Sequence, residues 1–222
     1  MNRVITLERS TLLSQLADEI VRQPADPYVR VAIDGFDGAG KTIFADELGE
    51  VLTARSYNVI RATVDRFHNP RSIRHARGRK SPEGFYRDSY DLSALTSSLL
   101  EPLGPGGNGL YCHGVFDVGS DTPRKELVMQ AEPRSILLLD GIFLHRQELS
   151  GWWSWSVWLD VNPNISFARI QNRDGMGSAD PNADSNIRYL EGQRLYVTEA
   201  NPQGRASRMI DNNDLSTPII KR

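Results

Sequence analysis

Along this chain, segments with apolar residues at helical spacing alternate with short apolar runs typical of strands. Residues 6–23 place leucines and an isoleucine at helical spacing, and prolines at its end stop the segment. Residues 28–33 form a β-branched, apolar run typical of a buried strand, and residues 43–54 have the pattern of an amphipathic helix. Further strands are predicted at 58–65, 111–118, 135–139, 155–161 and 208–211, and further helices at 88–100, 165–172 and 187–198.

This alternation predicts an α/β fold with a mostly parallel sheet covered by helices on both faces. The length favours one domain over residues 1–222, with a small lid at about 166–187. Residues 69–84 are polar, basic and turn-rich, and we expect a surface loop there. Ligands of such sheets bind beyond the carboxyl ends of the strands. The aspartates that follow three strands, Asp34, Asp65 and Asp140, should therefore crowd one site.

Composition narrows the class of protein. A formal net charge of −2 gives no general attraction to nucleic acid or to an anionic membrane. The single cysteine, Cys112, excludes an internal disulfide and fits a reducing compartment. No apolar run is long enough to span a membrane, and the N-terminus lacks the features of a signal peptide. We therefore expect a cytoplasmic protein without nucleic-acid or membrane partners, and a homo-oligomer remains open.

The octapeptide at 35–42, GFDGAGKT, matches G-x-x-x-x-G-K-[ST] at all four defined positions, which is the P-loop or Walker A motif. Its glycines let backbone N–H groups converge on phosphate oxygens at the positive end of a helix. Lys41 would reach the β- and γ-phosphates, and the Thr42 hydroxyl would ligate Mg²⁺. A glycine-rich turn with an incidental lysine is the alternative, but the strand before it and the helix after it favour a nucleoside triphosphate. The nucleotide-binding residues predicted are Gly35, Asp37, Gly38, Ala39, Gly40, Lys41, Thr42 and Ile43.

Two of the strand-ending carboxylates have predicted roles in phosphoryl transfer. Asp140, at the end of the most buried-looking strand, is placed to hold Mg²⁺ together with Thr42. Asp65 is placed to accept the proton of an acceptor hydroxyl as phosphate transfers, whereas a GTPase would position water there. The alternatives are a turn residue for Asp140 and a helix or turn cap for Asp65. Neither Asp34 nor Asp37 is favoured as the base.

Arginines near the predicted lid could complete the site. Arg169 and Arg173 are four residues apart on a predicted helix, so they share a face and could neutralise charge on the transferring phosphoryl group. A solvated basic face is the alternative. The dense basic run at 71–80 lacks interleaved aromatic residues, which disfavours single-stranded nucleic acid. It could hold phosphates of the donor or an anionic acceptor, or simply be a solvated loop.

Other conspicuous residues carry less information. The four tryptophans at 152–158 flank a predicted strand, where packing explains them better than base stacking. His75 and His145 have no partner pattern in the sequence, and nothing resembles a set of zinc ligands. The metal predicted is therefore the Mg²⁺ that accompanies the nucleotide.

Five features taken together resemble the uridine kinase-like branch of P-loop kinases, which adjoins phosphoribulokinase and pantothenate kinase. They are GFDGAGKT at 35–42, DRFH at 65–68, DSYD at 88–91, the Asp140-Gly141 pair and the Arg169/Arg173 spacing. The resemblance runs from about residue 28 to 212 and includes QRLY at 193–196 and Pro202. It implies a P-loop kinase fold, ATP and Mg²⁺ as cofactors, and phosphorylation of a hydroxyl on a small molecule.

The same resemblance implies roles for individual residues. Asp65 would activate the acceptor hydroxyl, with Lys41, Arg169 and Arg173 as the other catalytic residues. The acceptor would contact His68, Phe85, Tyr86 and Tyr111. The histidine by which uridine kinases read the pyrimidine has no counterpart, since Phe116 or Asp117 stands there.

Three functions therefore stay open from the sequence. A nucleoside such as uridine or cytidine is the acceptor that the resemblance implies. The arginine-rich run favours instead an anionic acceptor, such as a phosphosugar or a pantothenate-like carboxylate. A nucleotide-binding switch with little turnover is the third, although no NKxD-type guanine-reading element is present.

Overall fold

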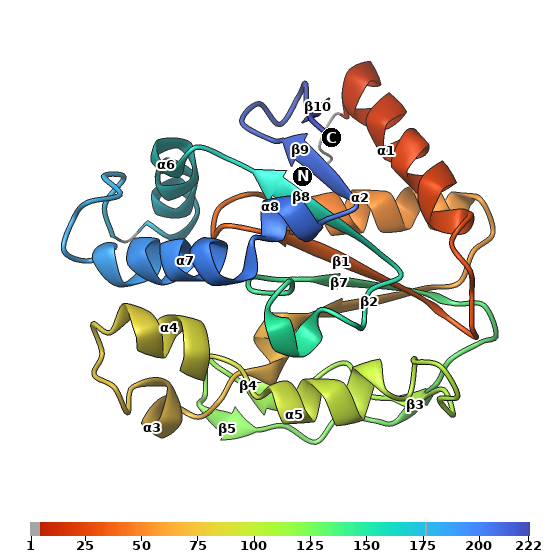
Figure 1. Ribbon diagram of the computed structural model, residues 1–222, viewed down its shortest axis with the longest axis horizontal. Helices are drawn as coiled ribbons and strands as arrows, with labels where there is room; N and C mark the ends of the chain where they lie inside the picture. The colour runs from red at the N-terminus through yellow and green to blue at the C-terminus, as the bar shows by residue number, and fades with distance from the viewer. Residues whose placement is uncertain (1–4, 176) are drawn as a thin grey trace.

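The computed structural model describes residues 5–175 and 177–222 and contains a central six-stranded sheet (Figure 1). The strands stand in the order β10-β9-β8-β1-β7-β2. Their bounds are β1 Val29–Gly35, β2 Val59–Thr63, β7 Ile136–Asp140, β8 Trp155–Asp160, β9 Arg208–Asp211 and β10 Ile219–Ile220. All neighbours pair in parallel except β9 and β10, which confirms the predicted mostly parallel sheet.

The register brings the carboxyl ends of the central strands together. In β7, Asp140 stands opposite Ile33 of β1 on one side and Thr63 of β2 on the other. β1 itself is buried along its whole length, as expected for the middle strand of a sheet covered on both faces. The glycine-rich loop after β1 therefore begins beside the end of β7, where Asp140 lies.

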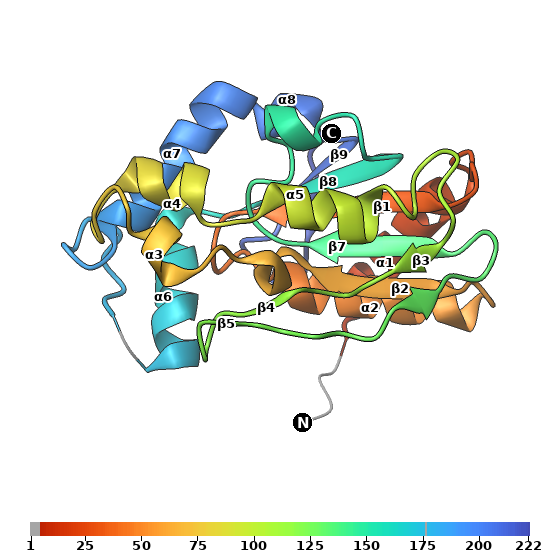
Figure 2. The same ribbon diagram turned by 90° about the horizontal axis from the view of Figure 1, so that it is seen from below.

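Helices cover both faces of the sheet (Figure 1). Helices α1 (Leu7–Val21) and α2 (Lys41–Ala54) pack on one face, and their leucines form a core with alternate residues of β1 and β7. Helices α4 (Pro82–Asp88), α5 (Leu92–Leu95) and α7 (Ile187–Ala200) contribute to a second core on the other face. Figure 2 shows α3 (Arg71–Arg74), α4, α6 (Pro163–Asp174) and α7 gathered at the end of the sheet where β1 and β7 finish.

The segment predicted as one surface loop and one long helix is divided differently. Residues 69–84 contain α3 and the start of α4, and the helix predicted at 88–100 begins later, with α5, and is not one regular α-helix. Ser81 accepts a hydrogen bond from the N–H of Gly84, and Pro82 occupies the first turn, so α4 starts there. Asp91 caps α5 by accepting from the N–H of Ala94, after which a π-helical turn η2 (Thr96–Leu100) follows.

Two other predicted boundaries are wrong. Asp65 lies not in β2 but in a 3₁₀ turn, η1 (Val64–Phe67), where the Thr63 side chain accepts from the Asp65 N–H. The strand predicted at 111–118 is replaced by two short ladders, because the chain turns back twice in this region. β3 (Leu110–Tyr111) pairs with β6 (Met129–Gln130), and β4 (Phe116–Asp117) pairs with β5 (Thr122–Pro123).

The remaining elements are a 3₁₀ turn η3 (Gln147–Leu149) and a short helix α8 (Pro202–Arg205). Across the described residues, no helix combines the length and the apolar character needed to cross a membrane.

Candidate active site

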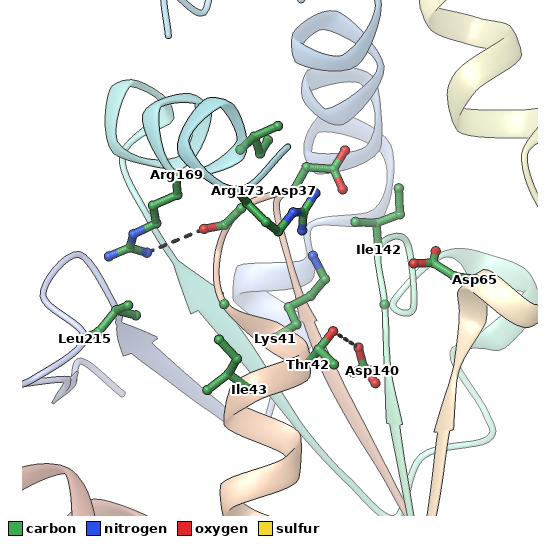
Figure 3. A pocket seen from close by; sticks show the side chains of 14 residues that line it. Asp37, Lys41, Thr42, Ile43, Asp65, Asp140, Ile142, Arg169, Arg173 and Leu215 are labelled. Carbon is green, nitrogen blue, oxygen red and sulfur yellow. Dashed lines mark hydrogen bonds between the residues drawn. The ribbon is translucent and has the colours of Figure 1, made fainter. Parts of the chain in front are cut away.

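A cavity of about 550 Å³ opens at the carboxyl ends of β1 and β7 (Figure 3). Its walls come from the loop 35–42 with the start of α2, the turn η1, the end of β7, helix α6 and the segment after β9 that carries Leu215. The residues that line it are Asp37, Gly38, Gly40, Lys41, Thr42, Ile43, Asp65, Asp140, Gly141, Ile142, Arg169, Ile170, Arg173 and Leu215. Five segments far apart in the sequence therefore contribute to one site.

The loop between β1 and α2 has the backbone shape that only glycine adopts easily. Gly38 and Gly40 have φ values of +73° and +89°, in the left-handed region. A Cβ on Gly38 would also meet the carbonyl oxygen of Ser166, well inside van der Waals contact. Since Gly40 is the N-cap of α2, the first N–H groups of this helix face the cavity without helical partners. This arrangement suits an oxyanion such as phosphate.

Lys41 and Asp37 place opposite charges at the loop. The Lys41 ammonium donates to the carbonyl oxygen of Phe36 at 2.8 Å and extends toward the middle of the cavity (Figure 3). Burial raises the pKa of the half-buried Asp37 carboxyl, while the positive charge of Lys41 opposes that rise. The Asp37 N–H is held by the side-chain oxygen of Gln193 at 2.7 Å, which ties α7 to the loop.

Thr42 and Asp140 supply two oxygen atoms to one spot. The Thr42 hydroxyl donates to Asp140 Oδ2 at 2.7 Å, and Arg61 donates to the other carboxylate oxygen at 3.0 Å. A hydroxyl and a carboxylate are ligands that Mg²⁺ prefers, so the pair fits a metal that takes its remaining ligands from water and phosphate. Consistent with that incomplete protein set, the described part of the chain contains no cluster of three or more metal-binding His, Cys, Asp or Glu side chains.

Asp65 faces the cavity from the side opposite α6 (Figure 3). The Tyr90 hydroxyl donates to Asp65 Oδ1 at 2.9 Å, and Tyr90 itself is only 4% exposed. Burial, together with the Asp65 charge, raises the pKa of Tyr90 well above its ordinary value, so this hydroxyl stays protonated and acts as a donor. The half-buried His68 contacts both of these residues. Its Nδ1 lies 2.8 Å from the backbone carbonyl oxygen of Asp65, and its ring centroid lies 4.6 Å from that of Tyr90.

The two predicted lid arginines line the cavity, but their guanidinium groups do not converge. Arg169 donates to the carbonyl oxygens of Asn212 and Asn213 at 3.1 and 2.7 Å, on the Leu215 side of the cavity. Arg173 pairs with the neighbouring Asp174 and lies beside Asp37 in Figure 3. Helical spacing put both on one face, but the carbonyl groups of the loop after β9 hold Arg169 on the far side. The lid at 166–187 stays a prediction, and Met176 within it lies outside the described residues, as do residues 1–4.

None of the four predicted acceptor residues is among those that line the cavity. Phe85 and Tyr86 are buried in α4, where their rings pack edge-on against Phe143. Tyr111, on β3, is 4% exposed and packs against His113. Apolar packing accounts for all three positions, and His68 alone of the four predicted acceptor residues contacts Asp65.

Several residues that support the site carry no signal for that role in the sequence. Tyr90 belongs to the DSYD motif without a predicted contact to Asp65, and Arg61 and Gln193 have no predicted role. His145, which has no partner pattern in the sequence, bonds Asp34 Oδ2 through Nδ1 at 2.7 Å and Ser156 Oγ through Nε2 at 2.9 Å. The signal for such a contact was the aspartate in a buried strand, because a buried carboxylate needs hydrogen-bond partners.

Comparison with known proteins finds similarity in structure but not in sequence. No family model matches the chain, and no curated protein matches it in sequence. Among solved structures, a possible uridine kinase from Bacillus stearothermophilus superimposes with a TM-score of 0.68 at 20% identity, covering 89% of this chain and 96% of that one. A protein provisionally described as a fructose transport system kinase from Silicibacter sp. gives a TM-score of 0.65 at 20% identity, covering 85% and 95%.

A more distant structure extends the same similarity. D-glycerate 3-kinase from Cryptococcus neoformans gives a TM-score of 0.56 at 11% identity, covering 86% of this chain and 87% of that one. The chain therefore has the α/β fold of the P-loop kinases. More particularly, the predicted resemblance to the uridine kinase-like branch is confirmed at the level of the fold.

Proposed function

We propose that this protein is a cytoplasmic, ATP-dependent kinase that transfers the γ-phosphate of ATP to a hydroxyl group of a small molecule. The observation that carries the proposal is that Lys41, the Thr42–Asp140 pair and Asp65 line one cavity. A phosphate cradle, a place for a divalent metal and an unobstructed carboxylate are the parts that phosphoryl transfer to a hydroxyl requires. The kinases among the structural neighbours support the same class of reaction.

In this proposal the loop 35–42 holds the phosphates of ATP through its backbone N–H groups. Lys41 leaves the carbonyl of Phe36 to contact the β- and γ-phosphates, while Thr42 and Asp140 hold Mg²⁺ directly or through water. The bound Mg²⁺ would supply positive charge to the phosphate oxygens. Arg173, which lies at the cavity mouth, would add to that charge as it builds up on the transferring group.

Asp65 would serve as the base. The acceptor hydroxyl would lie between Asp65 and the γ-phosphate, and its proton would pass to the carboxylate as its oxygen forms a bond to phosphorus. The bond from that phosphorus to the bridging oxygen of ADP would break in the same step. The products are the phosphorylated acceptor, ADP and a proton on Asp65 that is then lost to water.

Two classes of acceptor are candidates. A nucleoside such as uridine or cytidine is supported by the resemblance in sequence and by one structural neighbour described as a possible uridine kinase. An anionic acceptor is supported by the arginines around α3, whose arrangement is described below. A switch protein would bind the nucleotide but show little dependence on any acceptor.

Measurement of ADP release tests the proposal. The chain is incubated with Mg²⁺ and ATP, alone and with each member of a panel of nucleosides, sugars, phosphosugars and hydroxy acids. We expect ADP release to rise strongly with one class of acceptor. ATP binding without acceptor-dependent turnover across the whole panel would instead favour the switch.

A further inference from the structure

Five positively charged or titratable side chains gather where α3, the loop after it and the first turn of α7 meet. We call Arg71, Arg74, His75, Arg79 and Arg188 the cationic cluster. In Figures 1 and 2, α4 lies beside α7 and α3 lies beside α4, at the same end of the sheet as the cavity. Because the whole chain carries a net charge of −2, this local concentration of positive charge is not a consequence of a basic composition.

The charge of the cluster is poorly compensated. Arg74 pairs with Asp121 at 3.0 Å, but among the described residues no carboxylate forms an ion pair with Arg71, Arg79 or Arg188. The neighbouring arginines outside the cluster behave differently: Arg77 pairs with Asp88 and Arg87 with Glu83. Burial and the four surrounding arginines all lower the pKa of His75, as expected where positive groups converge.

Arg188 contributes an unsatisfied donor to this cluster. Its Nη1 donates to the carbonyl oxygen of Arg79 at 3.0 Å, and its guanidinium lies 5.6 Å from the centroid of the Phe85 ring. Its Nε is buried and has no hydrogen-bond partner among the residues that the structure describes. Burial is also the main reason why the pKa of Arg188 is lowered. A buried, charged N–H without an acceptor is costly, so an oxyanion that could accept from it would be bound favourably.

The cluster is connected to the proposed base by short contacts. Arg74 Nε donates to the carbonyl oxygen of Asn69 at 2.8 Å. The preceding residue, His68, contacts the Asp65 carbonyl oxygen at 2.8 Å. The guanidinium of Arg74 is thus fixed on the segment that begins with the base. A molecule with a hydroxyl at Asp65 and a second polar group further along this segment would reach the cationic cluster.

We propose that the acceptor carries an anionic group, a phosphate or a carboxylate, which binds the cationic cluster while its hydroxyl lies at Asp65. The inference rests on the proposed kinase function and specifies its substrate class. Oxygen atoms of either group can balance the charges of Arg71, Arg79 and Arg188. A neutral nucleoside would leave these charges unbalanced.

Turnover with matched acceptors provides the first test. Each pair differs only in the anionic group: a sugar and its phosphate, a polyol and the corresponding hydroxy acid, and a nucleoside and its monophosphate. We expect kcat/KM for the anionic member of at least one pair to exceed that of its neutral partner about 10-fold or more. Equal or higher kcat/KM for the neutral members would overturn the inference while leaving the kinase proposal intact.

Binding of inorganic phosphate tests the anion site without any turnover. The side-chain Nε–H resonance of Arg188 is assigned by its absence from the spectrum of Arg188→Lys, and it is followed by NMR as phosphate or acetate is added. A saturable shift of this resonance, with no shift of the Arg194 resonance, supports the site, and the stronger of the two ligands indicates phosphate or carboxylate. No shift, or equal shifts at both arginines, would overturn it. If the protein shows the shift but consumes no ATP, the kinase proposal is overturned while the anion site stands.

Substitutions connect the site to the acceptor. Arg188→Gln should raise KM for the anionic acceptor about 10-fold with little change in KM for ATP. Arg71→Gln, at an exposed position, should act in the same direction and serves if the Arg188 variant folds poorly. Arg194→Gln is the matched control, because Arg194 is exposed on the same helix and pairs with Glu191. An unchanged KM in both cluster variants would contradict the inference.

Discussion

The hydroxyl of Tyr90 donates a hydrogen bond to the carboxylate of Asp65, with 2.9 Å between Tyr90 Oη and Asp65 Oδ1. The two residues are held together along the backbone as well, since the Asp91 N–H donates to the carbonyl oxygen of Phe67 at 2.7 Å and His68 and Tyr90 form an isolated antiparallel bridge. A buried tyrosine therefore fixes the direction in which an exposed carboxylate points.

Removal of that hydroxyl should slow the chemical step. Tyr90→Phe keeps the ring against His68 but deletes a hydrogen bond to a charged group, so the carboxylate is less well oriented toward the acceptor. We expect kcat to fall about 10-fold while KM for ATP and the thermal midpoint change little. Steady-state kinetics and thermal unfolding check this. An unchanged kcat would show that Asp65 is oriented without Tyr90.

Asp65 itself should be required for turnover. Asp65→Asn removes the proton acceptor but keeps the size of the side chain, so turnover with the true acceptor should fall about 100-fold or more. ATP affinity, measured by calorimetry, should be nearly unchanged. Asp18→Asn is the control, because Asp18 is an exposed carboxylate on α1 that pairs with Arg55. Full activity in the Asp65 variant would exclude it as the base.

The loop geometry predicts a sharp difference between two glycines. Gly38 and Gly106 share a φ of +73°, but a Cβ on Gly106 would meet nothing within 4 Å, whereas one on Gly38 would clash with the Ser166 carbonyl. Gly106→Ala should cost only the strain of the left-handed backbone, about 1 kcal/mol in the free energy of unfolding. Gly38→Ala should cost about 1–3 kcal/mol more and abolish ATP binding. Urea unfolding measures the stability of the two variants and calorimetry measures their ATP binding. Equal values for Gly38→Ala and Gly106→Ala would show that the clash is unimportant.

The buried polar group behind the loop should matter for stability. Asp34 is fully buried, and its Oδ2 accepts hydrogen bonds from the Tyr196 hydroxyl and from His145 Nδ1, while Oδ1 accepts from the Gly35 N–H. Tyr196→Phe leaves a buried carboxylate short of a donor and should lower the free energy of unfolding by about 1–3 kcal/mol. The hydroxyl of Tyr57 bonds no described residue, so Tyr57→Phe should lower the free energy of unfolding far less. Urea denaturation measures both.

His68 should make stability depend on pH. Burial lowers the pKa of His68 below the ordinary value of 6.5, although the carbonyl and the charge of Asp65 oppose this. The unfolded chain therefore binds the proton more readily, so the free energy of unfolding should decrease as the pH falls through about 6.5. In the His68→Gln variant, the free energy of unfolding measured with urea should change less with pH between about pH 7.5 and about pH 5.5. Parallel pH dependences for the two proteins would contradict this assignment.

Much of the fold was predictable because its signals lie in consecutive residues. The run at 28–33 and the glycines of the octapeptide predicted a strand, a phosphate-binding turn and a helix, and β1 and α2 lie there. The boundaries that failed depend on side chains that compete with the local pattern. Ser81 caps α4, a helix that the apolar spacing did not predict, Asp91 caps α5 inside the helix predicted at 88–100, and Asp65 follows β2 in a 3₁₀ turn.

The site was predictable only in part. Lys41 and Thr42 were identified from the octapeptide motif at 35–42, and Asp65 and Asp140 because parallel strands end at one edge, so a carboxylate after each strand is brought to the same place. Phe85, Tyr86 and Tyr111 were carried over from a resemblance, and their packing buries them away from the cavity.

By itself the sequence determined the strands and helices of the central sheet from β1 to α2, the phosphate-binding loop and the acids at the strand ends, since each depends on the spacing of near neighbours. Only the tertiary structure decided that Tyr90 orients Asp65, that Gln193 holds the Asp37 N–H and that Arg188 Nε is buried beside the arginines of α3. These contacts join residues separated by 25 or more positions. Their geometry follows from how the helices pack on the sheet, which no local pattern specifies.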